Sequence, residues 1–222
     1  MHHIFFQGGL GDGKTFGMSL LAHWLKEQVE RRGGKIDLYS NYDLKDAMEM
    51  VHYSDWYKVA ESQGSICCWD EAHMAFSNRK WSKHGQEIAT QVMMYTRKMQ
   101  SVQMYCSPSI NNVDSRIRQI VEVLVTMRQV KGGFKFYFYD YQTNESIRTV
   151  FFPMWKAKRI FKLNLYDTHN MVRSFPLPST EKQSEEFFDK LEEIHNEARG
   201  KNRDNKGTIT AIQPSETRLS KA

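Results

Sequence analysis

The sequence predicts an α/β fold in which helices flank a mostly parallel central sheet, and three features of the chain indicate this class. Stretches with the two-residue period of strands alternate with stretches that repeat every three or four residues, as helices do. A glycine-rich segment, residues 8–15, stands where the first strand passes into the first helix. A compact apolar run, residues 66–69, is typical of a strand covered on both faces. Alternating strands and helices joined by right-handed crossovers produce a parallel sheet.

The elements of the first half follow from local pattern. Residues 4–6 form a short apolar strand. A helix is expected from residue 14 to about residue 32, because apolar side chains recur at helical steps there: Met18, Leu21, Leu25 and Val29. Gly33 and Gly34 stop this helix. Residues 36–40 alternate like a half-buried strand, and residues 41–62 should form short helices and loops that cross back over the sheet.

The second half continues the alternation and then changes. Residues 65–69 are expected to be a central strand, 87–99 a helix, 102–106 a strand, 113–120 a helix and 121–127 a strand. Residues 134–141 and 147–152 should pair as antiparallel strands around Thr143 and Asn144, because both runs are rich in aromatic and β-branched residues. These two strands would extend the edge of the sheet.

Composition indicates a folded chain in a reducing compartment. With 222 residues, of which 40% are hydrophobic and 13% aromatic, the chain can bury the core of one large domain. Cys67, Cys68 and Cys106 lie in apolar runs without metal-binding spacing, so we expect buried, reduced thiols in a cytoplasmic protein. The formal net charge of +5 is compatible with an anionic partner. Neither a signal peptide nor an uncharged apolar run of about 18 residues is present, so no transmembrane segment is expected.

Residues 8–15 match the phosphate-binding loop (P-loop, or Walker A motif) G-x-x-x-x-G-K-[ST] at every fixed position. Glycines let consecutive backbone N–H groups turn inward around phosphates, and the following helix adds partial positive charge at the same point. Lys14 is expected to reach the β- and γ-phosphates of ATP, and the Thr15 hydroxyl to ligate Mg²⁺. The predicted nucleotide-binding residues are Gly8, Gly9, Leu10, Gly11, Asp12, Gly13, Lys14, Thr15 and Phe16. The fold class is therefore that of a P-loop NTPase.

A second pair of residues completes the expected chemistry. A P-loop needs a carboxylate at the end of a neighbouring strand (the Walker B position) to hold Mg²⁺, and Asp70 follows the apolar run 66–69. Glu71 is placed to polarise the attacking water, which favours hydrolysis over transfer to a small acceptor. Residues 70–73 also spell Asp-Glu-Ala-His, but helicases with that signature carry two tandem domains, for which this chain has no room. We expect His73 to be a local helix-start residue.

Four arginines and one serine are further candidates for the site. Ring-shaped motors use an arginine that reaches the nucleotide of the neighbouring subunit. The chain offers Arg79, Arg97, Arg116 and Arg118, and the last two follow a strand end and are expected to lie near the nucleotide edge. Ser107 stands just after the strand 102–106, where a sensor of the γ-phosphate would lie. A plain salt-bridge role for each arginine and a turn role for Ser107 remain the alternatives.

The chain divides into four expected regions. Residues 1–153 form the P-loop core, 154–180 a basic-aromatic linker, 181–199 an amphipathic C-terminal helix and 200–222 a polar, disordered tail. In the linker, cations alternate with Trp155 and Phe161, as in nucleic-acid or anionic-surface patches: Lys156, Lys158, Arg159 and Lys162. A merely solvated face is the alternative for this stretch.

With these residues in place, the chain resembles the FtsK–HerA superfamily of P-loop motors, and within it two groups of phage and viral ATPases. These are the zonula-occludens-toxin-like family and the packaging ATPases of membrane-containing viruses. The resemblance covers roughly residues 1–170. Besides the P-loop, it rests on residues 38–42 (Leu-Tyr-Ser-Asn-Tyr), 69–73 (Trp-Asp-Glu-Ala-His) with Phe76 and Arg79, 95–100 (Tyr-Thr-Arg-Lys-Met-Gln), 114–118 (Asp-Ser-Arg-Ile-Arg) and 165–168 (Leu-Tyr-Asp-Thr). The superfamily usually has Gln where Ser107 stands.

The resemblance implies a homo-oligomeric ring, often a hexamer, with ATP and Mg²⁺ at the subunit interfaces and DNA in the centre. The first expectation is an ATP-hydrolysing DNA translocase that packages a phage or viral genome in the host cytoplasm or at a virion vertex, with a capsid protein as partner. The alternative is a filamentous-phage assembly and export ATPase that acts with a membrane protein. Assembly proteins of that type carry a transmembrane helix after the ATPase, which this sequence lacks. A small-molecule kinase and a non-hydrolysing nucleotide-binding scaffold are the remaining readings.

Overall fold

The computed structural model describes residues 2–62, 64–75, 83–167, 172–174 and 176–207. Within these residues, an eight-stranded sheet has the strand order β3-β2-β4-β5-β1-β6-β7-β8. The strands are β1 (His3–Gln7), β2 (Asp37–Ser40), β3 (Ala47–Glu49), β4 (Ser65–Trp69), β5 (Ser101–Ser107), β6 (Val123–Val130), β7 (Gly133–Asp140) and β8 (Ser146–Pro153). All neighbours pair in parallel except β6–β7 and β7–β8, which are antiparallel. The predicted fold class is confirmed, including the antiparallel strands at one edge.

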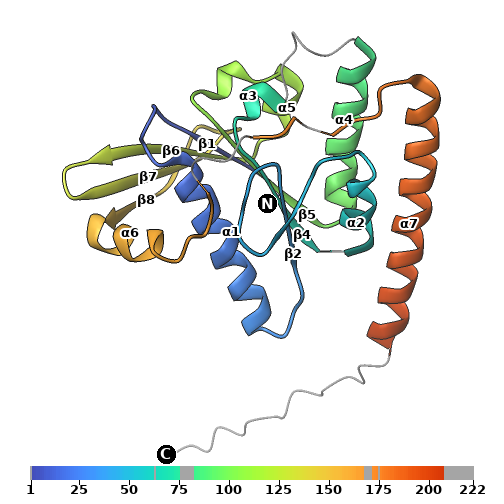
Figure 1. The fold of residues 1–222 in the computed structure, drawn as a ribbon, viewed down its shortest axis with the longest axis horizontal. Helices are drawn as coiled ribbons and strands as arrows, with labels where there is room; N and C mark the ends of the chain where they lie inside the picture. Colours follow the sequence, from blue (N-terminus) through green and yellow to red (C-terminus); the bar gives the residue numbers. More distant parts are fainter. Residues whose placement is uncertain (1, 63, 76–82, 168–171, 175, 208–222) are drawn as a thin grey trace, which may run out of the picture.

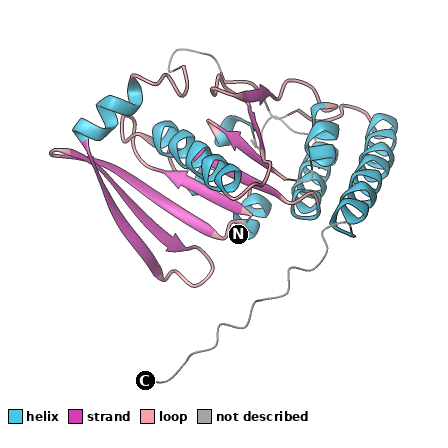
Figure 2. Cartoon of the chain, turned by 90° about the horizontal axis from the view of Figure 1, so that it is seen from below, coloured by secondary structure: helices cyan, strands magenta, loops and turns pink. Residues whose placement is uncertain are grey.

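Helices cover both faces of the sheet (Figure 1). They are α1 (Lys14–Arg31), α2 (Asp55–Ser62), α3 (Ala72–Ala75), α4 (Lys83–Lys98), the 3₁₀ helix η1 (Ile110–Asn112), α5 (Ser115–Ile120), α6 (Met154–Phe161) and α7 (Glu181–Gly207). At one end of the molecule α7 lies beside α2 and α4, and at the other end α6 lies beside β7 and β8. Figure 2 shows the long antiparallel strands projecting beyond the helices at that second end.

Two hydrophobic clusters, one on each face, hold these layers together. Successive side chains of a strand point to opposite faces, so β1 divides its apolar residues between the clusters. Phe5 packs with residues of α2, α4, α5 and α7, whereas Ile4 and Phe6 pack with residues of α1 and α6. Every residue of β4 is buried, as expected for a strand covered on both faces. The three cysteines are buried and free, as predicted from their apolar surroundings.

The region after β8 differs from the expected linker and tail. Residues 154–161 form helix α6, because Ala157 and Phe161 lie four residues apart on one face and pack on the core; the rings of Phe16 and Phe161 lie 4.8 Å apart. The C-terminal helix continues past Gly200 to Gly207, because a single glycine inside a helix costs only about 1 kcal/mol. Residues 208–222 of the expected tail lie outside the described residues. Among the described residues, no helix is long and apolar enough to cross a membrane.

Candidate nucleotide-hydrolysis site

The glycine-rich loop connects β1 to α1, at the carboxyl edge of the parallel strands. Gly11 and Gly13 have φ angles of 80° and 84°, in the left-handed region that residues with a side chain rarely adopt. A Cβ atom on Gly13 would also lie 2.9 Å from the Phe134 ring, and one on Gly8 would lie 2.6 Å from the Met127 carbonyl oxygen. The glycines of the motif are therefore required both by backbone conformation and by close packing against β6 and β7.

Two side chains of the loop hold its shape. The Asp12 carboxylate accepts hydrogen bonds from the backbone N–H groups of Gly9 (2.7 Å) and Gln129 (2.9 Å), which ties the loop to β6. The Lys14 ammonium donates to the Gly9 carbonyl oxygen at 2.9 Å. Leu10 is fully exposed at the tip of the loop. Lys14 thus folds back over the loop, with its charge at the place where the motif holds phosphates.

Thr15 and Asp70 meet although 55 positions separate them in the sequence. The Thr15 hydroxyl donates to one Asp70 carboxylate oxygen at 3.0 Å. The other Asp70 oxygen accepts from the Glu71 N–H at 2.8 Å and from the Cys106 thiol at 2.9 Å. Burial and then the Asp70 charge raise the pKa of the Cys106 thiol well above its usual value, so the thiol keeps the proton that it donates. The contact between Thr15 and Asp70 is the one that a P-loop magnesium site needs.

The oxygen atoms of Thr15 and Asp70 fit Mg²⁺, which prefers hard oxygen ligands and few of them from protein. In the described part of the chain, no group of three or more His, Cys, Asp and Glu side chains could hold a metal ion by itself. Two protein oxygens are typical of a magnesium ion that is held largely by phosphate groups and water. These residues therefore fit a metal that arrives with a nucleotide.

Asn41 is a site residue that sequence reasoning did not single out, although it stands in the segment 38–42 that carried the family resemblance. Its side chain is fully buried. The amide oxygen accepts from the Asp70 N–H at 2.7 Å, and the amide nitrogen donates to the carbonyl oxygens of Asp70 (3.0 Å) and Arg173 (2.9 Å). Asn41 thus fixes the backbone that presents the Asp70 carboxylate. The only sequence signal for this role was an Asn directly after a predicted strand.

Glu71 has a positive φ angle of 47°, which turns the chain between β4 and α3. The Glu71 carboxylate lies 3.1 Å from Nδ1 of His73, and the same nitrogen lies 3.2 Å from the Ser107 hydroxyl. His73 is indeed in the short helix α3, but it also connects the predicted water-activating residue to the predicted sensor. Ser107 ends β5 and pairs with Gln7 of β1, so it stands at the edge that carries the P-loop.

A cavity of about 480 Å³ opens above the loop. Of the predicted nucleotide-binding residues, those that line it are Leu10, Gly11, Gly13, Lys14, Thr15 and Phe16, together with Asp70 and Glu71. Tyr166 and Asp167 line the opposite side, because residues 165–167 run back beside residues 43–45. Burial, followed by the charge of Asp70, raises the pKa of Tyr166 to about 12. Gly8, Gly9, Asp12 and Ser107 lie outside the lining.

The structure does not bring the candidate arginines into this cavity. Arg116 and Arg118 lie in α5, whose first turn is capped by Asp114; the carboxylate of Asp114 accepts from the Arg116 N–H at 2.8 Å. Nη1 of Arg116 and Nε of Arg118 are buried without a hydrogen-bond partner among the described residues. Arg97 lies in the last turn of α4, at the opposite edge of the sheet, and Arg79 lies outside the described residues.

The basic residues of the former linker are on the surface. Lys156, Lys158 and Arg159 are exposed on α6, and Lys162 follows directly. The Lys156 ammonium lies over the Trp155 ring at 5.4 Å from its centre. The helix that carries these cations also contributes Phe161 to the wall of the cavity, so the basic surface and the nucleotide cavity share one element.

Comparison with known proteins gives a family and a fold. A family model described as "Zonular occludens toxin (Zot)" matches residues 21–170. The N-terminal domain of zonular occludens toxin from Neisseria meningitidis is similar in structure, with a TM-score of 0.52 and 14% identity over 75% of this chain and 98% of that one. The genome packaging NTPase B204 from Sulfolobus turreted icosahedral virus 2 gives a TM-score of 0.47 and 9% identity over 68% of this chain and 97% of that chain. The search of curated proteins gave no match.

Proposed function

This chain belongs to the zonular occludens toxin family, and from that premise we propose that it is an ATP-hydrolysing motor that moves DNA during the assembly of a virus or phage. The observation that carries the proposal is the contact between Thr15 and Asp70 below an intact P-loop. Hydrolysis needs phosphate-binding N–H groups, a lysine, a pair of magnesium ligands and a residue that activates water. Lys14, Thr15, Asp70 and Glu71 all line one cavity with the glycine-rich loop, which supports this proposal.

The chemical roles follow from the positions. Backbone N–H groups of residues 8–15 and the Lys14 ammonium hold the β- and γ-phosphates, and Lys14 exchanges its bond to the Gly9 carbonyl for one to phosphate. Thr15 and Asp70 would hold Mg²⁺, which would supply positive charge to stabilise the phosphoryl oxygens during hydrolysis. Glu71 accepts a proton from the water that attacks the γ-phosphorus, which yields ADP and inorganic phosphate. Asn41 and Cys106 keep Asp70 in place.

Motor action requires coupling between subunits and a nucleic-acid surface. Arg116 and Arg118 carry buried donor atoms without partners among the described residues, and we assign to them the interfacial role in a homo-oligomeric ring. The exposed cations of α6 and the net charge of +5 favour a polyanionic partner such as DNA. Ser107 would report the γ-phosphate to Glu71 through His73.

Two uses of such a motor are candidates. Genome packaging would bring the ring to a capsid vertex in the host cytoplasm. Filamentous-phage assembly and export, the alternative use, would bring it to a membrane protein. A kinase is disfavoured by the placement of Glu71 beside the metal ligand, and a scaffold without hydrolysis by the intact set of Lys14, Thr15, Asp70 and Glu71.

The test separates binding from hydrolysis. Lys14→Ala should abolish binding of a fluorescent ATP analogue, because the phosphate charge loses its partner. Glu71→Gln should bind the analogue normally but lower turnover by at least about 100-fold, the range of general-base catalysis. Lys35→Ala and Glu145→Gln remove comparable charges from exposed positions and should change neither quantity. Normal affinity in Lys14→Ala, or normal turnover in Glu71→Gln, would contradict the proposed roles.

A further inference from the structure

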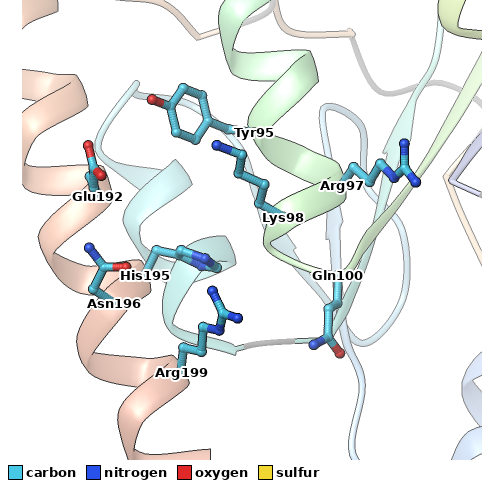
Figure 3. A pocket seen from close by; sticks show the side chains of 8 residues that line it. All are labelled: Tyr95, Arg97, Lys98, Gln100, Glu192, His195, Asn196 and Arg199. Carbon is cyan, nitrogen blue, oxygen red and sulfur yellow. The ribbon is translucent and has the colours of Figure 1, made fainter.

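A second cavity lies between α4 and α7, away from the nucleotide site. Its volume is about 560 Å³, and its lining comes from the last turn of α4, from Gln100 and from the middle of α7 (Figure 3). Helix α4 passes directly into β5, so this groove stands at the amino edge of the parallel strands. The P-loop follows the carboxyl end of β1, at the opposite edge. The two cavities share no lining residue.

Along one face of α7, apolar residues give way to polar residues, and these polar residues line the groove. Phe187 and Leu191 are buried and fix the helix in the core; the rings of Tyr57 and Phe187 lie 5.5 Å apart. Further along the same helix, polar residues at steps of three and four take over the lining: Glu192, His195, Asn196 and Arg199. Since Phe187 and Leu191 already anchor α7 in the core, the polar residues that follow are available to bind a ligand.

The residues that line the groove include three cations and one carboxylate, Glu192. Figure 3 shows Lys98 and Arg199 directed into the space between the helices, with His195 between them, whereas Arg97 points toward the strands. Among the described residues, no acidic side chain forms an ion pair with either Lys98 or Arg199. The pKa of His195 is lowered by burial and then by the charges of Arg199 and Lys98, with Glu192 opposing them. The histidine therefore experiences the positive potential that an anion would neutralise.

The dipole of α4 explains only part of this arrangement. Cations are favourable in the last turn of a helix, which accounts for Arg97 and Lys98. Arg199 stands in the interior of another helix, so the same argument does not place it beside them. Lys98 and Arg199 both line the groove and both act on His195, so their charges add there and a bound anion would offset them.

We propose that the groove between α4 and α7 binds the phosphodiester backbone of nucleic acid, with Lys98 and Arg199 on the phosphates. This proposal rests on the proposed DNA-moving function and adds a contact surface to it. The planar guanidinium of Arg199 suits phosphate oxygens, and the amides of Asn196 and Gln100 add neutral donors at the rim. The half-buried Tyr95, with the Lys98 ammonium 5.0 Å from its ring centre, forms the wall. The location at the edge opposite the P-loop allows DNA and ATP to bind together.

The test measures the salt dependence of DNA binding. Fluorescence anisotropy with a labelled DNA duplex gives the association constant of the full chain over a series of KCl concentrations. Each phosphate contact contributes about 0.9 to the slope of log K against log salt. Lys98→Gln combined with Arg199→Gln should therefore flatten the slope by about 2 and weaken binding at least tenfold at low salt. The control, Lys35→Gln with Lys182→Gln, removes the same charge from exposed positions and should leave the slope unchanged.

The remaining arms separate the possible outcomes. Equal slopes in the groove variant and the wild type would overturn the proposal. So would a groove variant that loses binding of poly-glutamate or of inorganic phosphate while it retains DNA binding, because the site would then serve another anion. ATP turnover without DNA should be the same in the groove variant and the wild type. Absence of turnover in the wild type would contradict the proposed function alone, whereas turnover with an unchanged DNA slope would contradict the groove alone.

Discussion

Replacement of Asn41 by Ala tests whether a buried amide holds the metal-binding carboxylate. Asn41 makes three side-chain hydrogen bonds, two to the backbone of Asp70 and one to the Arg173 carbonyl. It is fully buried, so water cannot replace the lost partner without entering the core. The backbone bonds of residue 41 to Cys68 and Arg173 do not depend on its side chain and would remain.

The structure gives the size of the effect. Each hydrogen bond contributes a net of about 1 kcal/mol, so the three together suggest a loss of roughly 3 kcal/mol in the free energy of unfolding. A second effect falls on function, because the Asp70 carboxylate loses the contact that orients its backbone. Loss of such a supporting residue typically lowers metal affinity by roughly 10- to 100-fold. We therefore expect the Mg²⁺ concentration at half-maximal ATP turnover to rise by that factor.

Urea unfolding followed by circular dichroism gives the free energy, and a magnesium titration of ATP turnover gives the second quantity. The matched control is Asn111→Ala, since Asn111 is exposed and its amide oxygen only accepts from Arg118. The control should remain within about 0.5 kcal/mol of the wild type. If Asn41→Ala unfolds like the control and needs no more Mg²⁺, the reasoning about Asp70 is refuted.

Three further predictions concern pH, the hydrolytic residue and packing. Burial lowers the pKa of His3 from 6.5 to about 4, so the unfolded chain binds a proton more tightly than the folded chain. The stability that His3 contributes above pH 6.5 should therefore be lost on acidification, by about 2 kcal/mol at pH 5. The free energy of unfolding of His3→Gln, measured in urea, should fall less between pH 7 and pH 5 than that of the wild type, and an equal fall would contradict this. His73→Ala should lower kcat about tenfold with an unchanged KM for ATP, because the Glu71 carboxylate loses its neighbour at 3.1 Å. An unchanged kcat would show that His73 is only structural. A Cβ on Gly133 would lie 2.1 Å from a carbonyl oxygen of β8, so Gly133→Ala should cost more than about 2 kcal/mol. Gly64→Ala, where the nearest atom is 3.4 Å away, should be nearly neutral, and urea unfolding of the two variants compares them.

Much of the fold could be predicted from the sequence, because the relevant patterns are local. The helix that begins at Lys14 and the fully buried strand Ser65–Trp69 were predicted from periodicity and composition, and the structure confirms both. The antiparallel pairing of β7 and β8 was also predictable, since two aromatic runs flank a turn at Asn144. Helix α6 was missed because its cations alternate with apolar residues, which hides the four-residue step between Ala157 and Phe161.

The supports of the candidate site could not be predicted in the same way. Asp70 was identified by its place after a strand, but its partners Asn41 and Cys106 lie 29 and 36 positions away. No spacing rule connects residues on three different strands; only the sheet order β2-β4-β5 brings their ends together. The groove at Lys98 and Arg199 was missed for the same reason, since its two cations come from helices that meet only in the folded chain.

The central claim is that this family member hydrolyses ATP to move DNA, and one measurement tests it most directly. The rate of ATP turnover should be measured with and without double-stranded DNA, alongside light scattering for the mass of the assembly. The account predicts turnover by a ring-sized oligomer that DNA stimulates several-fold and that Glu71→Gln abolishes. Turnover by a monomer that is indifferent to DNA, or no turnover at all, would contradict it.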